Sequence, residues 1–442
     1  MNKIFFTLFF ICLCTIAKAQ PDTVKLNKYL KQLDKYDKAM VSVCLYDKGH
    51  FVHDYAIGSS DIEKKIKSNV YTHYRIGSIS KMFTAIMILQ LIEEKKLSLD
   101  TKLKTYYPTI KNSDKITIEH LLNHRSGIEN FTNEEAYMSY MESPKSEKEL
   151  MVIFEKLSSD FTPDTKFSYS NTNYVLLSFI IEKVTKSTYA AQLTKRICVK
   201  AKLADTREGV KINTNNNEAQ SYNFEGGKWT KTTETDMTIP RGAGNIVSTT
   251  RDLCLFIEAL FEGKLISRPM LDKMKTIKDG YGYGMLQFPF GEKKFYGHTG
   301  GIDGFQSMLG YNEEDKVAFC ILGNGFNYSI NDIAIVLLSA YYNKPYEIPN
   351  FEKRSLNAVE SKSLEGVYGN SKINMKITVF KKDGNLMAQA TGQDAFPLEK
   401  VSELEYKFDG GGINLLFIKD KDDLIKNFRL KQGGMDLLFD KE

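Results

Sequence analysis

Residues 75–83 read Arg75-Ile76-Gly77-Ser78-Ile79-Ser80-Lys81-Met82-Phe83, which places a serine three positions before a lysine. The residues that follow, 84–92, are too densely apolar for a surface helix and predict a buried one. A hydroxyl in the first turn of such a helix lies in the field of its positive end, beside free backbone N–H groups. Because positions i and i+3 share one helix face, Lys81 can reach the hydroxyl of Ser78. The stretch therefore predicts Ser78 as a nucleophile, with Lys81 handling its proton.

Ser-x-x-Lys alone also fits a capping serine beside a solvated lysine, so a second proton-handling group should follow in the chain. Phe167-Ser168-Tyr169-Ser170-Asn171 lies directly before a helix that we expect to start near Tyr174. Tyr169 is a candidate proton acceptor there. The Asn171 amide could bond a substrate carbonyl or bridge Lys81.

A candidate oxyanion site lies in Tyr296-Gly297-His298-Thr299-Gly300-Gly301, where an expected strand arrives at paired glycines. Glycines let a substrate lie close along a strand and leave backbone N–H groups free to bind an oxyanion. The alternative is a turn whose histidine has only a structural role.

The start of the chain predicts export. Met1-Asn2-Lys3 is a short basic leader, residues 4–17 are apolar, and Ala17-Lys18-Ala19 is a small-x-small cleavage site. We expect residues 1–19 to be a signal peptide, cleaved near Ala19, and the mature protein to be secreted or periplasmic. An uncleaved membrane anchor is the alternative, but the apolar run is shorter than the ~20 residues that span a bilayer.

Charge and cysteine content narrow the class of protein. Loss of residues 1–19 removes two lysines and no acidic residue, so the formal net charge falls from +5 to +3 and predicts no nucleic-acid partner. Nothing after the signal is long and apolar enough to span a membrane. No Cys or His pair has metal-ligand spacing, so we expect neither a metal site nor a cofactor. The remaining cysteines lie in apolar surroundings and are expected to be buried free thiols: Cys44, Cys198, Cys254 and Cys320.

About 420 mature residues exceed one ordinary domain. Two prolines in residues 341–350, followed by a charged segment, suggest a seam between a domain at 20–350 and one at 360–442. Before the seam we expect strands and helices, with the first and last strands in one antiparallel sheet: strands at 40–46, 51–57, 306–311 and 317–322, and helices at 80–95, 117–124, 174–186 and 250–261. After it, short runs between glycine turns predict a small antiparallel sheet or barrel: 375–380, 385–390, 413–417 and 435–439.

Taken together, these segments resemble the serine β-lactamase and penicillin-binding protein superfamily, in the branch of class C β-lactamases, D-Ala-D-Ala carboxypeptidases and related esterases. Ser78-Ile79-Ser80-Lys81 matches the nucleophile motif of that superfamily, and Tyr169-Ser170-Asn171 matches its Tyr-x-Asn motif. His298-Thr299-Gly300 matches its Lys/His-Thr-Gly motif. Residues 116–128 and 242–253 match as well, so the resemblance covers roughly residues 38–340.

The resemblance implies an α+β fold, in which an antiparallel sheet packs between an all-helical region and an α/β region, with a small C-terminal β domain appended. It implies that Ser78 attacks an acyl carbonyl and that the N–H groups of Ser78 and Gly301 hold the oxyanion. Lys81 and Tyr169 would pass the proton, and water would release the acyl-enzyme. It also implies a set of substrate-binding residues: Asn171, His298, Thr299 and Gly300.

The expected chemistry depends on the pKa values of Lys81, Tyr169 and His298. Lysine near 10.4 and tyrosine near 10 are both protonated at neutral pH, so we expect neighbouring positive charge and burial to lower the pKa of both Lys81 and Tyr169. His298 stands where β-lactamases usually carry lysine. As an imidazolium below an ordinary pKa near 6.5, it would pair with a substrate carboxylate only at acidic pH.

The sequence therefore predicts a secreted serine hydrolase that acts on amide or ester bonds of a small molecule or peptide, such as a cell-wall peptide, through an acyl-enzyme. A D-Ala-D-Ala-type peptidase or an esterase is favoured over efficient β-lactam hydrolysis, because His298 is no permanent cation. Two alternatives stay open, a β-lactamase proper and a penicillin- or muropeptide-binding protein that does not turn over. The natural substrate and the oligomeric state are not encoded in any motif that we can read.

Overall fold

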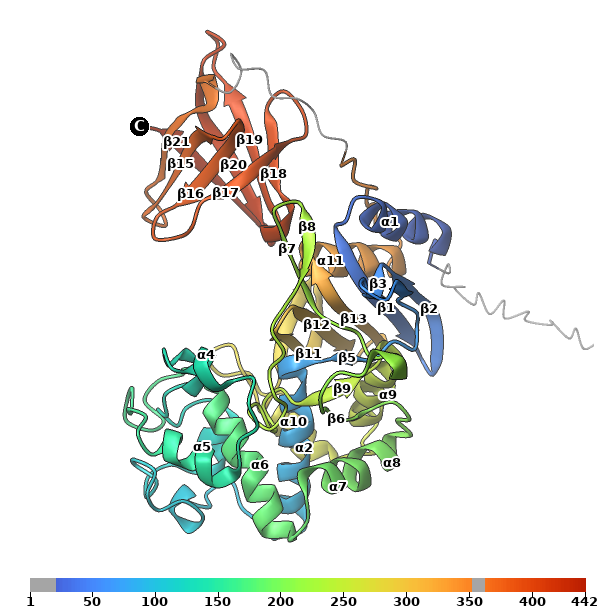
Figure 1. The fold of residues 1–442 in the computed structure, drawn as a ribbon, viewed down its shortest axis with the longest axis vertical. Coiled ribbons are helices and arrows are strands. Elements are labelled where there is room, and N and C mark those ends of the chain that lie inside the picture. The colour runs from blue at the N-terminus through green and yellow to red at the C-terminus, as the bar shows by residue number, and fades with distance from the viewer. Residues whose placement is uncertain (1–20, 352–361) are drawn as a thin grey trace, which may run out of the picture.

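The computed structural model describes residues 21–351 and 362–442; the predicted signal peptide (1–19) and part of the predicted seam (352–361) lie outside them. A six-stranded antiparallel sheet, in the order β10-β11-β12-β13-β1-β2, forms the centre of the N-terminal part (Figure 1). β1 pairs with both β2 and β13, so the expected pairing of the first and last strands is confirmed. The strands of this sheet are β1 Ala39–Asp47, β2 His50–Ile57, β10 Leu286–Phe290, β11 Lys293–Ile302, β12 Phe305–Asn312 and β13 Val317–Phe326.

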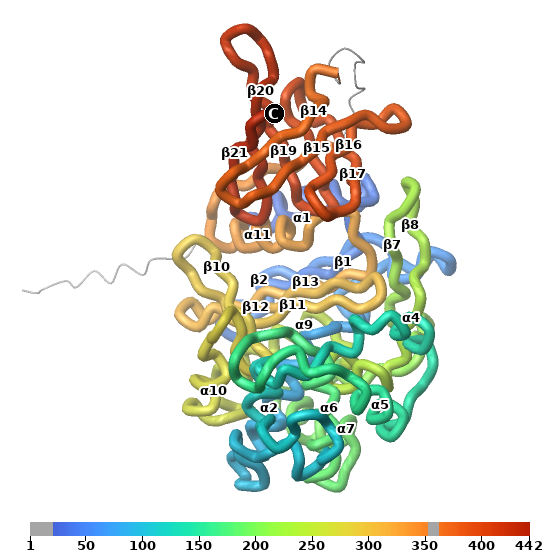
Figure 2. The backbone as a smooth tube through the Cα atoms, turned by 90° about the vertical axis from the view of Figure 1, so that its left-hand side faces the viewer, coloured from blue at the N-terminus to red at the C-terminus, as the bar shows by residue number. Residues whose placement is uncertain are grey.

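β1 is buried along both faces because helices cover the sheet on each side. Val41 and Val43 pack into a core with α1 and α11, whereas Cys44 joins the larger core around α2 and α9. This alternation is the period of two expected of a strand. Figure 2 shows the resulting layers, with α1 and α11 on one face of the sheet and α9 on the other. The bounds of these helices are α1 Thr23–Lys35, α2 Ser80–Glu93, α9 Thr250–Phe261 and α11 Ile330–Tyr341.

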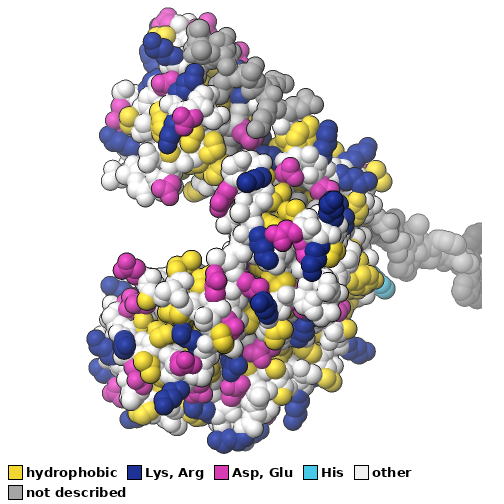
Figure 3. Space-filling view, viewed as in Figure 1, with side chains coloured by type: hydrophobic (Ala, Val, Ile, Leu, Met, Phe, Trp, Pro, Cys, Tyr) yellow, Lys and Arg dark blue, Asp and Glu magenta, His cyan; other side chains and the backbone are white. Residues whose placement is uncertain are grey.

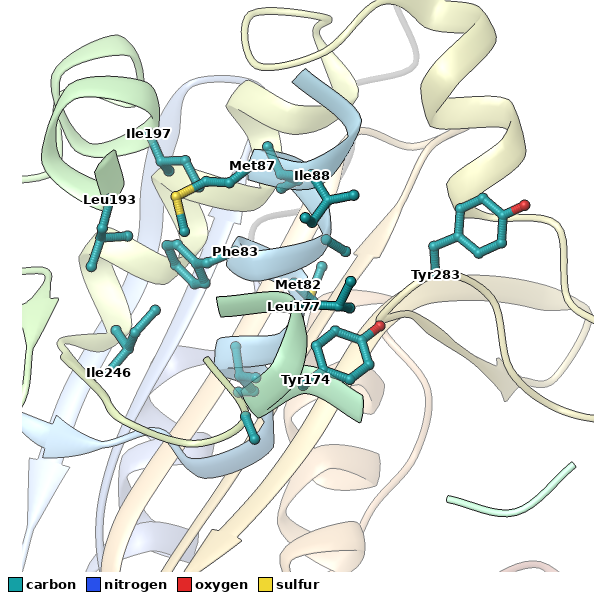
Figure 4. Close-up of a cluster of buried hydrophobic side chains, with 14 of the residues drawn as sticks. Met82, Phe83, Met87, Ile88, Tyr174, Leu177, Leu193, Ile197, Ile246 and Tyr283 are labelled. Atoms are coloured by element: carbon teal, nitrogen blue, oxygen red, sulfur yellow. The ribbon is translucent and has the colours of Figure 1, made fainter. Parts of the chain in front are cut away.

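α2 forms the centre of the helical region and is buried on every side, as its sequence predicts. Its side chains Met82 and Phe83 point into a cluster with Tyr174 and Leu177 of α6 (Figure 4). Phe83 also stacks on Phe256 of α9, with ring centroids 3.8 Å apart. The remaining helices are α3 Ile118–Leu122, α4 Tyr137–Tyr140, α5 Glu147–Phe154, α6 Asn171–Thr185, α7 Tyr189–Leu193, α8 Val199–Ala201 and α10 Arg268–Met274.

The helix expected near Tyr174 begins earlier, at Asn171. Ser170 before it is extended and is of a type that favours a helix start, although its side chain makes no capping hydrogen bond. The earlier start matters because it places Asn171 in the first turn of α6 and makes it face α2.

Small two- and three-stranded sheets complete the N-terminal part. β9 pairs with both β5 and β6, and so ties the chain before Ser78 to the segment after Gly244. The strands are β3 Ser59–Asp61, β4 Ile66–Lys67, β5 Tyr74–Arg75, β6 Arg207–Glu208, β7 Tyr222–Glu225, β8 Lys228–Lys231 and β9 Ile246–Ser248.

The C-terminal part is a closed antiparallel barrel around its own core, in which Tyr368, Tyr406, Phe417 and Phe428 are fully buried. The sequence predicted a sheet or barrel and located four of its strands, at residues 375–380, 385–390, 413–417 and 435–439. It missed the others because they are short or strongly charged, as Ile425–Gln432 shows. The strands are β14 Gly366–Asn370, β15 Met375–Lys382, β16 Asn385–Ala390, β17 Phe396–Lys400, β18 Glu405–Phe408, β19 Ile413–Lys419, β20 Ile425–Gln432 and β21 Met435–Lys441.

The barrel contacts the α1 and α11 side of the sheet. Lys38, which is almost fully buried just before β1, reaches Asp409 of the barrel at 2.7 Å and Glu399 at 3.4 Å. In the space-filling view a wide hollow separates the barrel from the helical region (Figure 3). The barrel therefore contacts the sheet layer and does not cover the helical region.

Two further expectations concern buried thiols and membrane spans. The four cysteines named above are free and buried, as predicted. Cys44 and Cys320 face each other on β1 and β13. Within residues 21–351 and 362–442, no helix has the length and apolarity needed to cross a bilayer.

Candidate active site

Ser78 lies on a short 3-10 turn, Gly77–Ile79, that leads into α2 and lies against β11. Two glycines permit this approach. Gly77 has φ +50°, and a Cβ there would lie 2.7 Å from the nitrogen of Gly301. A Cβ at Gly300 would lie 2.2 Å from the Ile76 carbonyl oxygen and 2.9 Å from the Ser78 nitrogen. The turn that carries Ser78 and the strand that carries Gly300 and Gly301 are therefore in close contact.

Lys81 is fully buried, and its Nζ has three polar neighbours. It lies 2.7 Å from Oδ1 of Asn171, 2.8 Å from the carbonyl oxygen of Ala243 and 3.0 Å from Oγ of Ser78. Among the described residues it contacts no carboxylate, and burial holds the pKa of Lys81 well below its ordinary value, as expected. Since the two carbonyl oxygens can only accept, Nζ donates a hydrogen to each of them, and its remaining hydrogen-bonding position faces Oγ of Ser78.

Tyr169 approaches the same hydroxyl from the other side, and its OH donates to Oγ of Ser78 at 2.8 Å. The Tyr169 ring lies 4.9 Å from Nζ of Lys81. The expectation that burial and positive charge lower the pKa of this tyrosine is wrong. Burial disfavours the phenolate and raises the pKa of Tyr169, while the hydrogen bond with Ser78 offsets only part of that effect. In the resting site Tyr169 is therefore a proton donor.

Asn171 takes the second of its two expected roles. Its Oδ1 accepts from Lys81, and its Nδ2 donates to Oγ1 of Thr132 at 3.2 Å. The side chain of Asn130 in turn accepts from the Asn171 backbone N–H at 2.9 Å. Both ends of the Asn171 amide are thus engaged by protein groups, which suits a residue that orients Lys81 better than one that binds substrate.

A cavity of about 340 Å³ opens beside Ser78. Its walls include most of the residues expected from the sequence, namely Ser78, Tyr169, His298, Thr299, Gly300 and Gly301. Lys81 and Asn171 are not part of this wall. The wall also contains residues that sequence reasoning missed: Phe167, Asp279, Gly280, Tyr281 and Leu286.

His298 is buried in the cavity wall, and its two ring nitrogens are engaged. Nδ1 contacts the carbonyl oxygen of Thr299, which can only accept, so Nδ1 carries the proton. Nε2 then accepts from the hydroxyl of Tyr281 at 2.9 Å. Burial, with a smaller effect of the Lys81 charge, lowers the pKa of His298 to about 3. The expected imidazolium is therefore wrong, and His298 is neutral across the working range of an enzyme.

Comparison with known proteins agrees with this geometry. A sequence model described as beta-lactamase matches residues 26–339. The chain belongs to the β-lactamase family. It is 27% identical over 332 residues to a teichoic acid D-alanine hydrolase of Staphylococcus aureus (strain NCTC 8325 / PS 47), covering 72% of this chain and 79% of the relative. The wider expectation, a serine hydrolase of the β-lactamase-related family, is confirmed.

Two solved structures extend the likeness. D-amino acid amidase from Ochrobactrum anthropi SV3 is 27% identical, with a TM-score of 0.63 over 72% of this chain and 98% of that one. The octameric penicillin-binding protein homologue from Pyrococcus abyssi is also 27% identical, with a TM-score of 0.66 over 95% of this chain and 100% of that one. The second likeness extends over the barrel as well as the hydrolase part.

In this member of the β-lactamase family the cavity wall carries one acidic side chain, Asp279. Of the residues that the structure describes, Asp279 contributes the only formally charged side chain to the wall, beside aromatic and backbone groups. Asp279 lies in a two-residue turn with Gly280, where Lys278 and Tyr281 exchange backbone hydrogen bonds of 3.1 Å. Arg125 contacts Asp279 and also Asp164, so one guanidinium is shared between two carboxylates. A Gly-containing turn before two tyrosines was the only sequence signal that could have marked this wall.

Proposed function

We propose that this hydrolase cleaves esters or amides of D-amino acids that carry a free ammonium group, through an acyl-enzyme on Ser78. The relatives named for D-alanine and D-amino acid hydrolysis motivate the D-aminoacyl group. The observation that carries the proposal is the charge of the cavity. Among the described residues, its wall holds one carboxylate, Asp279, and no cation, so it suits an ammonium and offers no partner to a carboxylate.

Acylation starts at Ser78. Its Oγ attacks the acyl carbon while its proton moves to the lone pair of Lys81, 3.0 Å away. The carbonyl oxygen gains negative charge and is held by the N–H groups of Ser78 and Gly301. Asn171 and the Ala243 carbonyl keep both amine hydrogens of Lys81 occupied, so the lone pair stays directed at the nucleophile.

Departure of the alcohol or amine needs a proton, and Tyr169 supplies it. The raised pKa of Tyr169 keeps its hydroxyl protonated until the bond to the leaving group breaks. The proton held by Lys81 then neutralises the phenolate, which returns both residues to their starting states. Water attacks the acyl-Ser78 ester by the same steps and releases the acid.

The test is a matched substrate set: D-alanine ethyl ester, its N-acetyl derivative, and the ester of D-alanine with D-lactate, whose leaving group carries a carboxylate. We expect kcat/KM for D-alanine ethyl ester to exceed both others by at least about tenfold, a difference of about 1.4 kcal/mol. Asp279→Asn should remove the preference for the free ammonium, and Ser78→Ala should abolish turnover. Faster hydrolysis of the lactate ester or of a chromogenic cephalosporin would overturn the proposal.

We also propose that the chain is exported and cleaved near Ala19, on the basis of the leader, apolar run and cleavage site read in the sequence. Intact mass of the protein recovered from outside the cytoplasm should match a chain that begins at Gln20. A mass that retains residues 1–19 would contradict cleavage.

A further inference from the structure

His124 is a buried residue beside Tyr169 that no step above uses. It follows α3, has no exposed surface, and adopts φ +58°, a backbone conformation that side-chain-bearing residues rarely occupy. Its ring packs against three site tyrosines, with centroids 4.3 Å from Tyr169, 4.7 Å from Tyr281 and 5.2 Å from Tyr174. A strained backbone held at such a place points to a role in the site.

His124 accepts two hydrogen bonds from the residues on either side of Tyr169 in the chain. The N–H of Ser168, on one side of the tyrosine, donates to the His124 carbonyl oxygen at 3.0 Å. The N–H of Ser170, on the other side, donates to Nδ1 of His124 at 3.1 Å. One residue therefore fixes the backbone both before and after Tyr169 and also packs on its ring.

These contacts also set the tautomer of His124. Nδ1 accepts from Ser170 and lies 3.3 Å from the amide nitrogen of Asn173, so the proton is on Nε2. Nε2 is buried and has no hydrogen-bond partner among the residues that the structure describes. Burial is the main cause that holds the pKa of His124 well below its ordinary value. The ring is thus a neutral acceptor at Nδ1 and takes no part in proton transfer itself.

We propose that His124 is a positioning residue that holds the hydroxyl of Tyr169 on Oγ of Ser78, ready to protonate the leaving group. The proposal rests on the role given to Tyr169 in the proposed function. It requires the acceptor at Nδ1, because the hydrogen bond from the Ser170 N–H holds the backbone conformation of residues 168–170. A ring without this acceptor would fill the space but would not hold that conformation.

The experiment separates positioning from bulk stability by changing the leaving group. A p-nitrophenyl ester and an ethyl ester of the same acyl group are compared. p-Nitrophenolate leaves without being protonated, whereas the ethyl ester needs a proton donor to release ethanol. In Tyr169→Phe, kcat/KM should fall on the order of 10²-fold for the ethyl ester and less than about tenfold for the p-nitrophenyl ester. His124→Phe, which keeps a ring and removes the acceptor, should show the same pattern.

His124→Asn is the matched control variant. Its Oδ1 can take the place of Nδ1 as acceptor, and asparagine tolerates a positive φ. We expect it to recover most of the ethyl-ester activity that His124→Phe loses, and it keeps the test informative if the phenylalanine variant does not fold. Equal losses on both esters in folded His124→Asn and His124→Phe would overturn the proposal, as would no loss in His124→Phe.

The outcomes also distinguish this inference from the proposed function. If Tyr169→Phe shows no dependence on the leaving group, the role of Tyr169 as proton donor fails. If Tyr169→Phe shows it and His124→Phe does not, only the positioning role of His124 fails.

Discussion

At the scale of single residues, the site depends on a buried lysine that has no carboxylate partner within residues 21–351 and 362–442. Lys81 is protonated in the unfolded chain and has a pKa held well below its ordinary value in the fold, because burial disfavours its charge. The unfolded state therefore binds the extra proton. At pH values between the lowered pKa and the pKa of 10.4 in the unfolded chain, the contribution of Lys81 to the free energy of unfolding rises with pH. Near neutrality, well below 10.4, Lys81 therefore destabilises the fold.

Lys81→Met should consequently be more stable than the wild type while losing activity. We expect the free energy of unfolding at pH 7 to rise by about 1–2 kcal/mol, as is common when a functional polar group is removed from a core. The gain should shrink as pH rises toward 10. Denaturant unfolding of both proteins at several pH values measures it, and a loss of stability at pH 7 would contradict the account of Lys81 as an uncompensated buried amine.

His298 yields the second prediction at this scale. Because its pKa is lowered to about 3, His298 stays neutral from pH 6 to pH 8 and does not attract a substrate carboxylate by charge. N-acetylated substrates are used because they have no ammonium group that could lose a proton between pH 6 and pH 8. The ratio of kcat/KM for the D-lactate ester to that for the ethyl ester should then be flat over this range. A ratio that climbs as the pH falls would show that His298 gains a proton and binds the carboxylate.

The residues of the site differ in how far the sequence could locate them. Ser78 and Lys81 are neighbours on one helix turn, so spacing alone brings them together. Tyr281 and His124 act through tertiary contacts with segments far away in the chain, and no local pattern encodes such contacts. The charge state of His298 was missed for the same reason, since it depends on burial that the sequence does not display.

At the scale of elements, the active site is a contact between a turn and a strand. The turn Gly77–Ile79 and the strand β11 approach so closely that Gly300 has no room for a side chain. Gly300→Ala should push β11 away from the turn and separate the two oxyanion donors. We expect kcat/KM to fall on the order of 10²-fold, about the loss of one oxyanion donor. Activity close to wild type, measured on protein whose melting temperature shows it to be folded, would count against the turn-strand contact as the source of the oxyanion site.

The elements themselves were largely predictable, because alternating and dense apolar patterns mark β1, β13 and α2 directly. The start of α6 was placed three residues too late, because the polar residues Asn171, Thr172 and Asn173 precede its dense apolar run. Half of the barrel strands were missed because they are short, as Gly366–Asn370 is, or carry charged residues that hide the apolar face, as Ile425–Gln432 does. In both cases the deciding interaction is tertiary packing, which outweighs local propensity.

At the scale of the whole molecule, we propose that residues 20–350 and 360–442 fold as two domains. The hydrolase part and the barrel have separate hydrophobic cores. The buried Lys38 and Asp409 connect them, with side chains only 6% and 10% exposed. Burial raises the pKa of Asp409 even though Lys38 opposes that effect, so this carboxylate depends on its partner to stay ionised.

Lys38→Met should leave Asp409 buried and unpaired, at a cost of about 3 kcal/mol in the docking of the barrel. Lys376→Met is the control, because Lys376 pairs with Glu442 on the exposed surface of the barrel and should cost no more than about 0.5 kcal/mol. Limited proteolysis at the seam measures docking. Equal cleavage rates in the two variants would indicate that the Lys38 pair does not hold the domains together.

The central claim is that Ser78 carries the acyl group during turnover of a D-aminoacyl ester. Rapid quenching in acid during hydrolysis of a D-alanine p-nitrophenyl ester, followed by peptide mass mapping, tests it most directly. The account predicts one D-alanyl mass increment, confined to the peptide that contains Ser78 and absent from Ser78→Ala. An increment on another residue, or steady turnover by Ser78→Ala, would contradict it.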